Sequence, residues 1–167
     1  MNPNRQERKI GPIISKEFQN SWNMLRQAVE NISDEFWLTT INEWSFSWTI
    51  YHIIETAEFY SHSTPLGMEW GKYAGINWEV DSEDEINKKK SLITKEVILN
   101  YLEDIEKRIS NYFTNVTDYD LFDTDGFDNG NLYVIEKMIY LLRHNMHHIG
   151  ELNKVLRDSN CQRISWR

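Results

Sequence analysis

The sequence predicts an all-α protein, a four-helix bundle with a long connection between its second and third helices. Apolar residues recur at steps of three and four in four separate segments, which is the period of an amphipathic helix. No segment shows the alternation typical of a half-buried strand, and no internal repeat of fixed period is present. Four amphipathic helices bury their apolar stripes most simply against one another, which favours a bundle.

The first two helices are bounded by clear signals. The first should cover about residues 13–32, where the apolar residues keep helical spacing. The second should begin near Ser45 or Ser47, because either hydroxyl could cap free amide groups. It should end at about Ser63, because Pro65 prevents continuation of the helix.

The second half of the chain predicts two further helices. Residues 66–90 contain three glycines and an acidic run without a sustained period, so we interpret them as a long connection with room for a short helix. A third helix over about residues 94–116 is capped by its first residue, a threonine. After a loop rich in Asp and Gly over residues 117–130, Asn131 can cap a long fourth helix that reaches about residue 157.

Composition limits the classes of function. The 167 residues fit a single domain, over residues 1–167, in which we expect residues 1–11 to form a mobile N-terminal arm. A net charge of −8 argues against binding of nucleic acid or anionic membranes. No apolar run is long enough for a membrane span or a signal peptide, and the single cysteine fits a reducing compartment. We therefore expect a soluble, cytoplasmic protein with a small-molecule partner.

The five histidines separate by helix face, because an α-helix turns by about 100° per residue. On the fourth helix, His144 and His148 lie within about 40° of each other and flank the apolar stripe. His147 should point to solvent or to a partner subunit. On the second helix, His52 lies inside the apolar arc, whereas His62 shares its face with two glutamates and should be a surface residue. Three histidines are therefore predicted to point inward.

This arrangement predicts a metal centre. Two histidines at i and i+4 can reach one ion, and a third from another helix completes a set of three ligands with coordination positions left over. We therefore expect His52, His144 and His148 to bind one divalent ion, such as Zn, Ni, Fe or Mn. The alternative is that each ring is merely hydrogen-bonded in the core. The metal hypothesis requires that the second and fourth helices be neighbours and that their histidines lie at the same height.

Other side chains are candidates for the chemistry. Glu151 lies one turn beyond His148 and is the nearest candidate for a catalytic general acid or base, with a solvated or interface carboxylate as the alternative. Trp48, Tyr60 and Tyr140 could line an apolar substrate pocket over the metal, with plain packing as the alternative.

A family resemblance covers nearly the whole chain. The segment HNMHHIGE, residues 144–151, resembles the His-x-x-x-His-x-Gly-Gln signature of the DinB/YfiT-like superfamily. Trp48, four residues before His52, resembles the first metal-ligand segment of that superfamily, and Trp166 resembles its frequent C-terminal tryptophan. The chain departs from the pattern at Glu151, where glutamine is usual. This puts any role of position 151 in supporting the metal ligands in doubt.

The resemblance implies an up-down-down-up bundle, often a homodimer, with a divalent metal on His52, His144 and His148. Characterised relatives include thiol-dependent S-transferases, a mycothiol-dependent isomerase and proteins described as metal-dependent hydrolases. We therefore expect a metal-dependent transferase or hydrolase in which the centre activates a thiol or water for attack on a small molecule, with a low-molecular-weight thiol as a further cofactor. The alternative is a non-catalytic binding or stress-response protein that keeps the scaffold.

Overall fold

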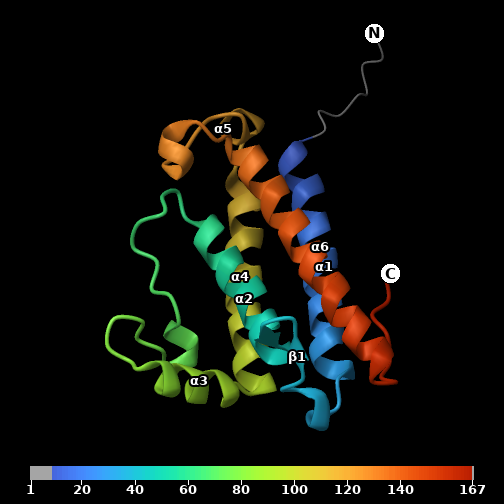
Figure 1. Cartoon of the computed structure of the whole chain (residues 1–167). Coiled ribbons are helices and arrows are strands. Elements are labelled where there is room, and N and C mark those ends of the chain that lie inside the picture. Colours follow the sequence, from blue (N-terminus) through green and yellow to red (C-terminus); the bar gives the residue numbers. More distant parts are fainter. Residues whose placement is uncertain (1–8, 167) are drawn as a thin grey trace.

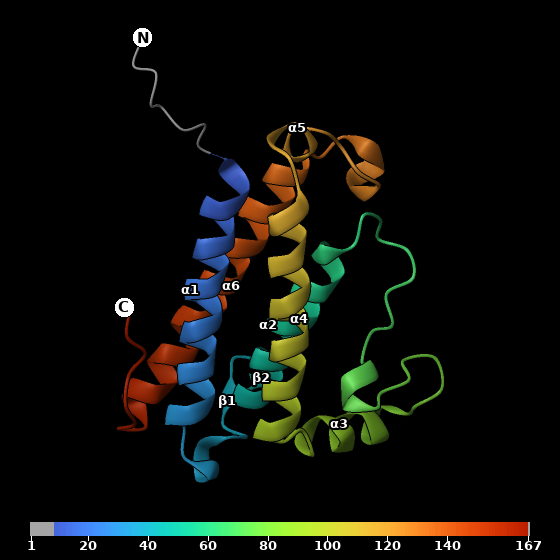
Figure 2. The same cartoon turned by 180° about the vertical axis from the view of Figure 1, so that it is seen from behind.

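The computed structural model describes residues 9–166, and its main feature is a bundle of four long helices (Figures 1 and 2). These helices are α1 (Ile10–Asn31), α2 (Phe46–Ser61), α4 (Lys95–Asn115) and α6 (Val134–Asp158). Both α1 and α2 pack against both α4 and α6. The chain runs one way along α1, the opposite way along α2 and α4, and back along α6 (Figure 1). The predicted all-α, up-down-down-up bundle is therefore confirmed.

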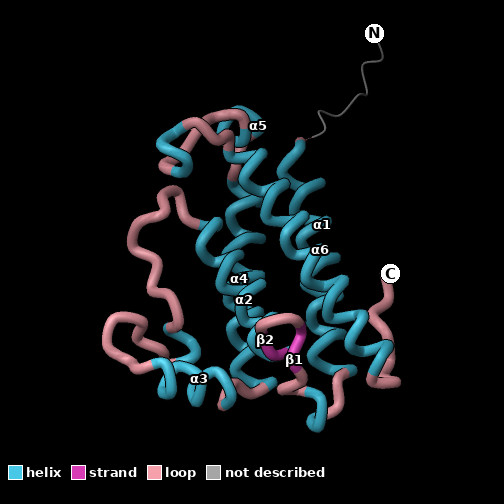
Figure 3. Tube along the Cα trace, viewed as in Figure 1, coloured by secondary structure: helices cyan, strands magenta, loops and turns pink. Residues whose placement is uncertain are grey.

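The connections carry shorter elements (Figure 3). In chain order they are η1 (Asp34–Phe36), β1 (Thr40–Ile41), β2 (Trp44–Ser45), η2 (Lys72–Ala74), α3 (Glu83–Ser91), α5 (Asp118–Leu121) and η3 (Phe127–Gly130). Strands β1 and β2 form an antiparallel hairpin in which Thr40 pairs with Ser45. The sequence analysis did not predict this hairpin, because strands of two residues are too short to show an alternating pattern.

Side-chain caps fix the starts of α2 and α4 as predicted. Ser45 Oγ accepts a hydrogen bond from the Trp48 amide at 3.1 Å. Thr94 Oγ1 accepts one from the Val97 amide at 3.2 Å. Each bond satisfies an amide that has no partner inside its helix, so each start is set by the local sequence.

The starts of α1 and α6 differ from the prediction. Helix α6 begins after Tyr133 rather than at Asn131, because the chain forms η3 first and the Glu136 carboxylate then accepts from the Tyr133 amide at 3.1 Å. Helix α1 begins at Ile10, so the end of the segment expected to be an N-terminal arm is helical. Residues 1–8 of that segment lie outside the described residues.

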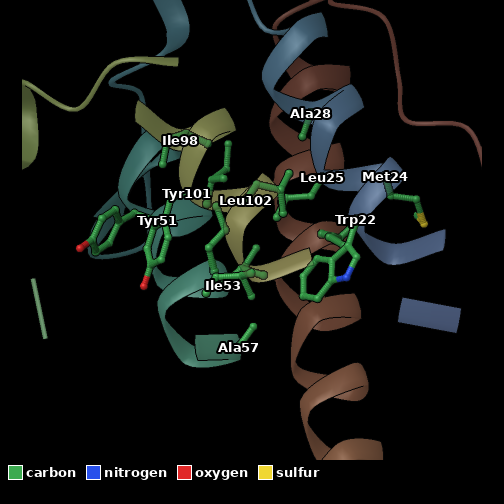
Figure 4. Packing of buried hydrophobic residues seen from close by; sticks show 14 of the residues in the cluster. Trp22, Met24, Leu25, Ala28, Tyr51, Ile53, Ala57, Ile98, Tyr101 and Leu102 are labelled. Carbon is green, nitrogen blue, oxygen red and sulfur yellow. The ribbon is translucent and has the colours of Figure 1, made fainter. Parts of the chain in front are cut away.

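The core lies where the four helices meet. In Figure 4, Trp22 and Leu25 of α1 lie beside Ile53 of α2 and Leu102 of α4, and all four side chains are buried. Leu141 of α6 is also fully buried. This packing holds α2 and α6 at a fixed height relative to each other, which determines where their inward side chains meet. Within the described part of the chain, no helix combines the length and the apolarity that a membrane span requires.

A long connection over residues 62–94 returns along the bundle, as two successive parallel helices require (Figure 1). It is held to α2 by a buried contact in which Gly71 N donates to Glu55 Oε1 at 2.6 Å. Gly71 has a φ of 82°, in the left-handed region that favours glycine. Glu55 is one of the two glutamates that share the predicted surface face of α2 with His62, but the connection covers it and it is buried.

Candidate metal centre

The three histidines predicted to point inward converge between α2 and α6. The Nε2 atoms of His52 and His144 lie 3.1 Å apart. The ring centroid of His148 lies 5.2 Å from that of His52 and 4.7 Å from that of His144. One ring nitrogen of each residue lies within 4.8 Å of the other two. The two requirements of the metal hypothesis, neighbouring helices and equal height, are therefore met.

The spacing fits a first-row divalent ion. Two nitrogens bound at 2.0–2.1 Å to one tetrahedral ion lie about 3.3 Å apart. The 3.1 Å between His52 and His144 is close to this value. All three histidines are half-buried, which limits competition from water. Three imidazoles could therefore hold an ion with coordination positions to spare.

Two rings of the centre, those of His52 and His144, are kept neutral. Burial first, and then the neighbouring His144 and His148 rings, lower the pKa of His52 to about 4. The pKa of His144 is likewise lowered to about 4, first by burial and then by His148, although the Asn145 amide acts in the opposite direction. Neutral imidazole is the form that binds a metal, so lone pairs are available at neutral pH without loss of a proton.

Glu151 lies on the outer side of His148. The ring Nδ1–H of His148 donates to Glu151 Oε2 at 2.7 Å, and Asn42 Nδ2 donates to Glu151 Oε1 at 3.2 Å. This carboxylate fixes the tautomer of His148 so that Nε2 carries the lone pair, the arrangement that supports many metal-bound histidines. The role of Glu151 as a general acid or base stays a prediction.

The sequence analysis missed two residues of the hairpin. The Trp44 ring centroid lies 4.5 Å from that of His52 and 6.2 Å from that of His148, so Trp44 covers one side of the centre. Asn42, which contacts Glu151, has a φ of 54° at the turn of the same hairpin. A local signal existed, because an asparagine in a two-residue turn is typical of a hairpin.

The predicted pocket residues lie in two places. Tyr60 and Tyr140 contact each other with ring centroids 5.3 Å apart, and the Tyr140 ring lies 6.4 Å from that of His144. Trp48 instead stacks on Tyr51 with centroids 4.7 Å apart and lines a separate small cavity. Whether any of the three binds substrate stays a prediction.

The other two histidines have different environments. The side chain of His147 is 69% exposed and lies 3.8 Å from Glu151, so its outward direction is confirmed. His62 was predicted to be a surface residue, but it is partly buried and its Nε2 is inaccessible to solvent. The difference arises because α2 ends there and the 117–133 connection folds over it, with Gly126 N donating to Ser63 O at 2.7 Å.

Comparisons with known proteins agree with this architecture. The profile of the DinB superfamily matches residues 17–152. A conserved protein from Enterococcus faecalis has a similar solved structure, with a TM-score of 0.68 and 13% identity over 90% of this chain and 97% of that one. A DinB-like protein from Bacillus cereus gives a TM-score of 0.64 and 14% identity over 96% and 99%. No curated protein matches. At these identities the two structures bear on the fold alone.

Proposed function

Because the chain belongs to the DinB superfamily, we propose that it is a metal-dependent enzyme whose His52, His144 and His148 hold one divalent ion. The substrate is a small molecule, and the reaction is S-transfer from a low-molecular-weight thiol or hydrolysis. The observation that carries the proposal is the convergence of three imidazole rings, two of which have Nε2 atoms 3.1 Å apart and pKa values lowered to about 4. Three convergent imidazole nitrogens are suited to a cation from outside the chain.

A divalent ion in such a centre lowers the pKa of a bound thiol or water and polarises a carbonyl group. The side chains around it have separate tasks. Glu151 orients His148 through the 2.7 Å hydrogen bond, which makes it a positioning residue in this proposal. Trp44 shields His52 from water on one side. Tyr60 and Tyr140 supply an aromatic wall next to His144.

Metal analysis tests the centre directly. Full-length protein, purified without a metal-affinity tag, should contain one divalent ion per chain by mass spectrometry of the elements. His144→Ala should lose it, because two imidazoles hold a divalent ion far less tightly than three. His147→Ala is the matched control, since it removes an exposed histidine from the same helix. An ion that His144→Ala retains at wild-type occupancy would contradict the ligand assignment.

Turnover is tested separately. The metal-loaded protein is incubated with low-molecular-weight thiols and electrophilic acceptors, and in parallel with activated esters and amides, while thiol loss and acid release are measured. We expect one of the two reactions in the wild type and in His147→Ala but not in His144→Ala. Full metal loading without either reaction would favour a binding protein on the same scaffold.

A further inference from the structure

A small cavity of about 230 Å³ shares a wall with the metal centre. It lies between the β1–β2 hairpin, the start of α2 and the end of α3. The shared wall is Trp44, which lines the cavity and also contacts the ring of His52 at a centroid distance of 4.5 Å. Leu38 and Trp48 add further apolar surface. The cavity is therefore suited to the apolar body of a small molecule next to the centre.

Lys90 gives this cavity a positive charge. Its half-buried side chain lines the cavity, and its Nζ lies 4.6 Å from the ring centroid of Trp48 and 5.3 Å from that of Trp78. Aromatic faces stabilise an ammonium group without neutralising its charge, and they leave N–H donors free.

Two neighbouring lysines, unlike Lys90, pair with carboxylates. Lys89 pairs with Asp81 at 2.5 Å, and Lys95 pairs with Asp34 at 2.8 Å. Among the residues that the structure describes, no carboxylate lies within ion-pair distance of Lys90. The ammonium group of Lys90 is thus half-buried, lies over two indole rings and has no counter-charge within the described part of the chain.

The remaining polar groups of the cavity are compatible with an anion. Ser45 is the N-cap of α2, so the positive end of that helix dipole faces the same space. Glu43 is the one carboxylate among the lining residues, and it is exposed at the hairpin turn, where water screens its charge.

We propose that this cavity binds the carboxylate of an acidic, otherwise apolar small molecule, with Lys90 as the counter-charge and Leu38, Trp44 and Trp48 against the apolar body. We take such a molecule to be the substrate of the neighbouring centre, and in this respect the inference rests on the proposed function. A ligand bound there contacts Trp44, whose ring also packs against His52, so one indole ring separates it from the centre.

Calorimetric titration of the metal-loaded, full-length protein with benzoate and with its neutral analogue benzamide tests the inference. Benzoate should bind, and benzamide should bind at least about tenfold more weakly, the range expected for one charged hydrogen bond. Lys90→Gln should weaken benzoate binding by a similar factor, and Lys90→Arg should retain it. Lys88→Gln is the matched control, because it removes an exposed lysine from the same helix.

Three results would overturn the inference. They are the absence of benzoate binding to the wild type, equal binding of benzamide, and equal weakening by Lys88→Gln and Lys90→Gln. Metal content separates this test from that of the proposed function, since His144→Ala should lose its ion yet keep its affinity for benzoate. If the metal-ligand assignment proved wrong, the benzoate result would still hold. If benzoate failed to bind, the metal result would still hold.

Discussion

The histidine centre and the Asp125–Lys137 ion pair both place polar side chains inside the bundle, and both use helix α6. At the ion pair, the chain supplies both charges: the Lys137 ammonium binds the Asp125 carboxylate and donates to the His62 carbonyl at 2.8 Å. At the centre, all three side chains are of the same kind, and burial keeps His52 and His144 neutral. A buried charge that finds its counter-charge in the chain is neutralised within the fold, whereas convergent donors without one point to a ligand.

The largest expected effect follows from breaking the internal pair. Asp125→Ala leaves Lys137, whose side chain is only 3% exposed, without its counter-charge. We expect the free energy of unfolding to fall by about 3–5 kcal/mol, as for other buried pairs that lose one partner. Urea denaturation measures the loss. Asp123→Ala, an exposed aspartate of the same connection, is the control.

The double variant Asp125→Ala/Lys137→Met sharpens the interpretation. Because it removes both charges, it should recover much of the stability that Asp125→Ala loses. If Asp125→Ala costs less than about 1 kcal/mol, the value of an exposed pair, then the pair is solvated and the contrast with the histidine centre fails.

The next effect tests whether the centre depends on an external cation. An ion present at a hundred times its dissociation constant stabilises the folded state by about 2.7 kcal/mol. A chelator should therefore lower the thermal midpoint of the metal-loaded wild type and of His147→Ala. His144→Ala should not respond to the chelator. A response of the same size in all three proteins would show that the stabilising ion binds elsewhere.

The hydrogen bond from Gly71 to Glu55 is a second case in which the chain itself satisfies a buried polar group. The backbone geometry of Gly71 predicts a smaller loss of stability on substitution. Gly71→Ala incurs the left-handed penalty of about 1–2 kcal/mol. In addition, a Cβ at this position would lie 2.8 Å from Ile76 Cβ and 2.8 Å from Trp78 Nε1. Gly75 is the matched control, because its φ of 65° is also left-handed but a Cβ there meets no atom within 4 Å. Urea denaturation should show a larger loss for Gly71→Ala than for Gly75→Ala.

Much of the centre could be predicted because its ligands lie on regular helices. Periodicity gives the inward direction of His52, His144 and His148, and a capping serine fixes where α2 begins. The relative height of two helices is not a local property, since it depends on the packing of the whole core. The convergence of the three rings therefore stayed a hypothesis until the fold was known.

The parts that could not be predicted are positioned by irregular segments. Trp44 reaches the centre from a hairpin with strands of two residues, and Asn42 reaches Glu151 from its turn. The burial of Glu55 could not be predicted either, because Glu55 shares a face of α2 with Glu58 and His62, a pattern typical of a surface face. It is buried only because the connection that follows α2 folds back over it.

Burial of Glu55 predicts how stability depends on pH, and the sign of this dependence is opposite to that expected for the histidine centre. Burial raises the pKa of the Glu55 carboxyl above 4.5, and Glu58 adds to the shift, although the Gly71 amide and the Tyr51 hydroxyl act against it. The folded state therefore binds a proton more tightly than the unfolded state does. The contribution of Glu55 to stability is fully present below pH 4.5 and is lost as the pH rises through the folded-state pKa.

Glu55→Gln isolates this contribution, because the amide is neutral at every pH and its oxygen can still accept from Gly71 N. The stability of Glu55→Gln relative to the wild type should therefore increase from pH 4.5 upward in urea denaturation. The histidine centre acts in the opposite direction: with folded-state pKa values of about 4, His52 and His144 make the metal-free protein lose stability as the pH falls below 6.5. A relative stability of Glu55→Gln that stays constant or falls with rising pH would mean that the folded state holds this carboxyl as a stabilised anion. The chain would then satisfy a buried negative charge with polar hydrogen-bond donors and without a counter-charge.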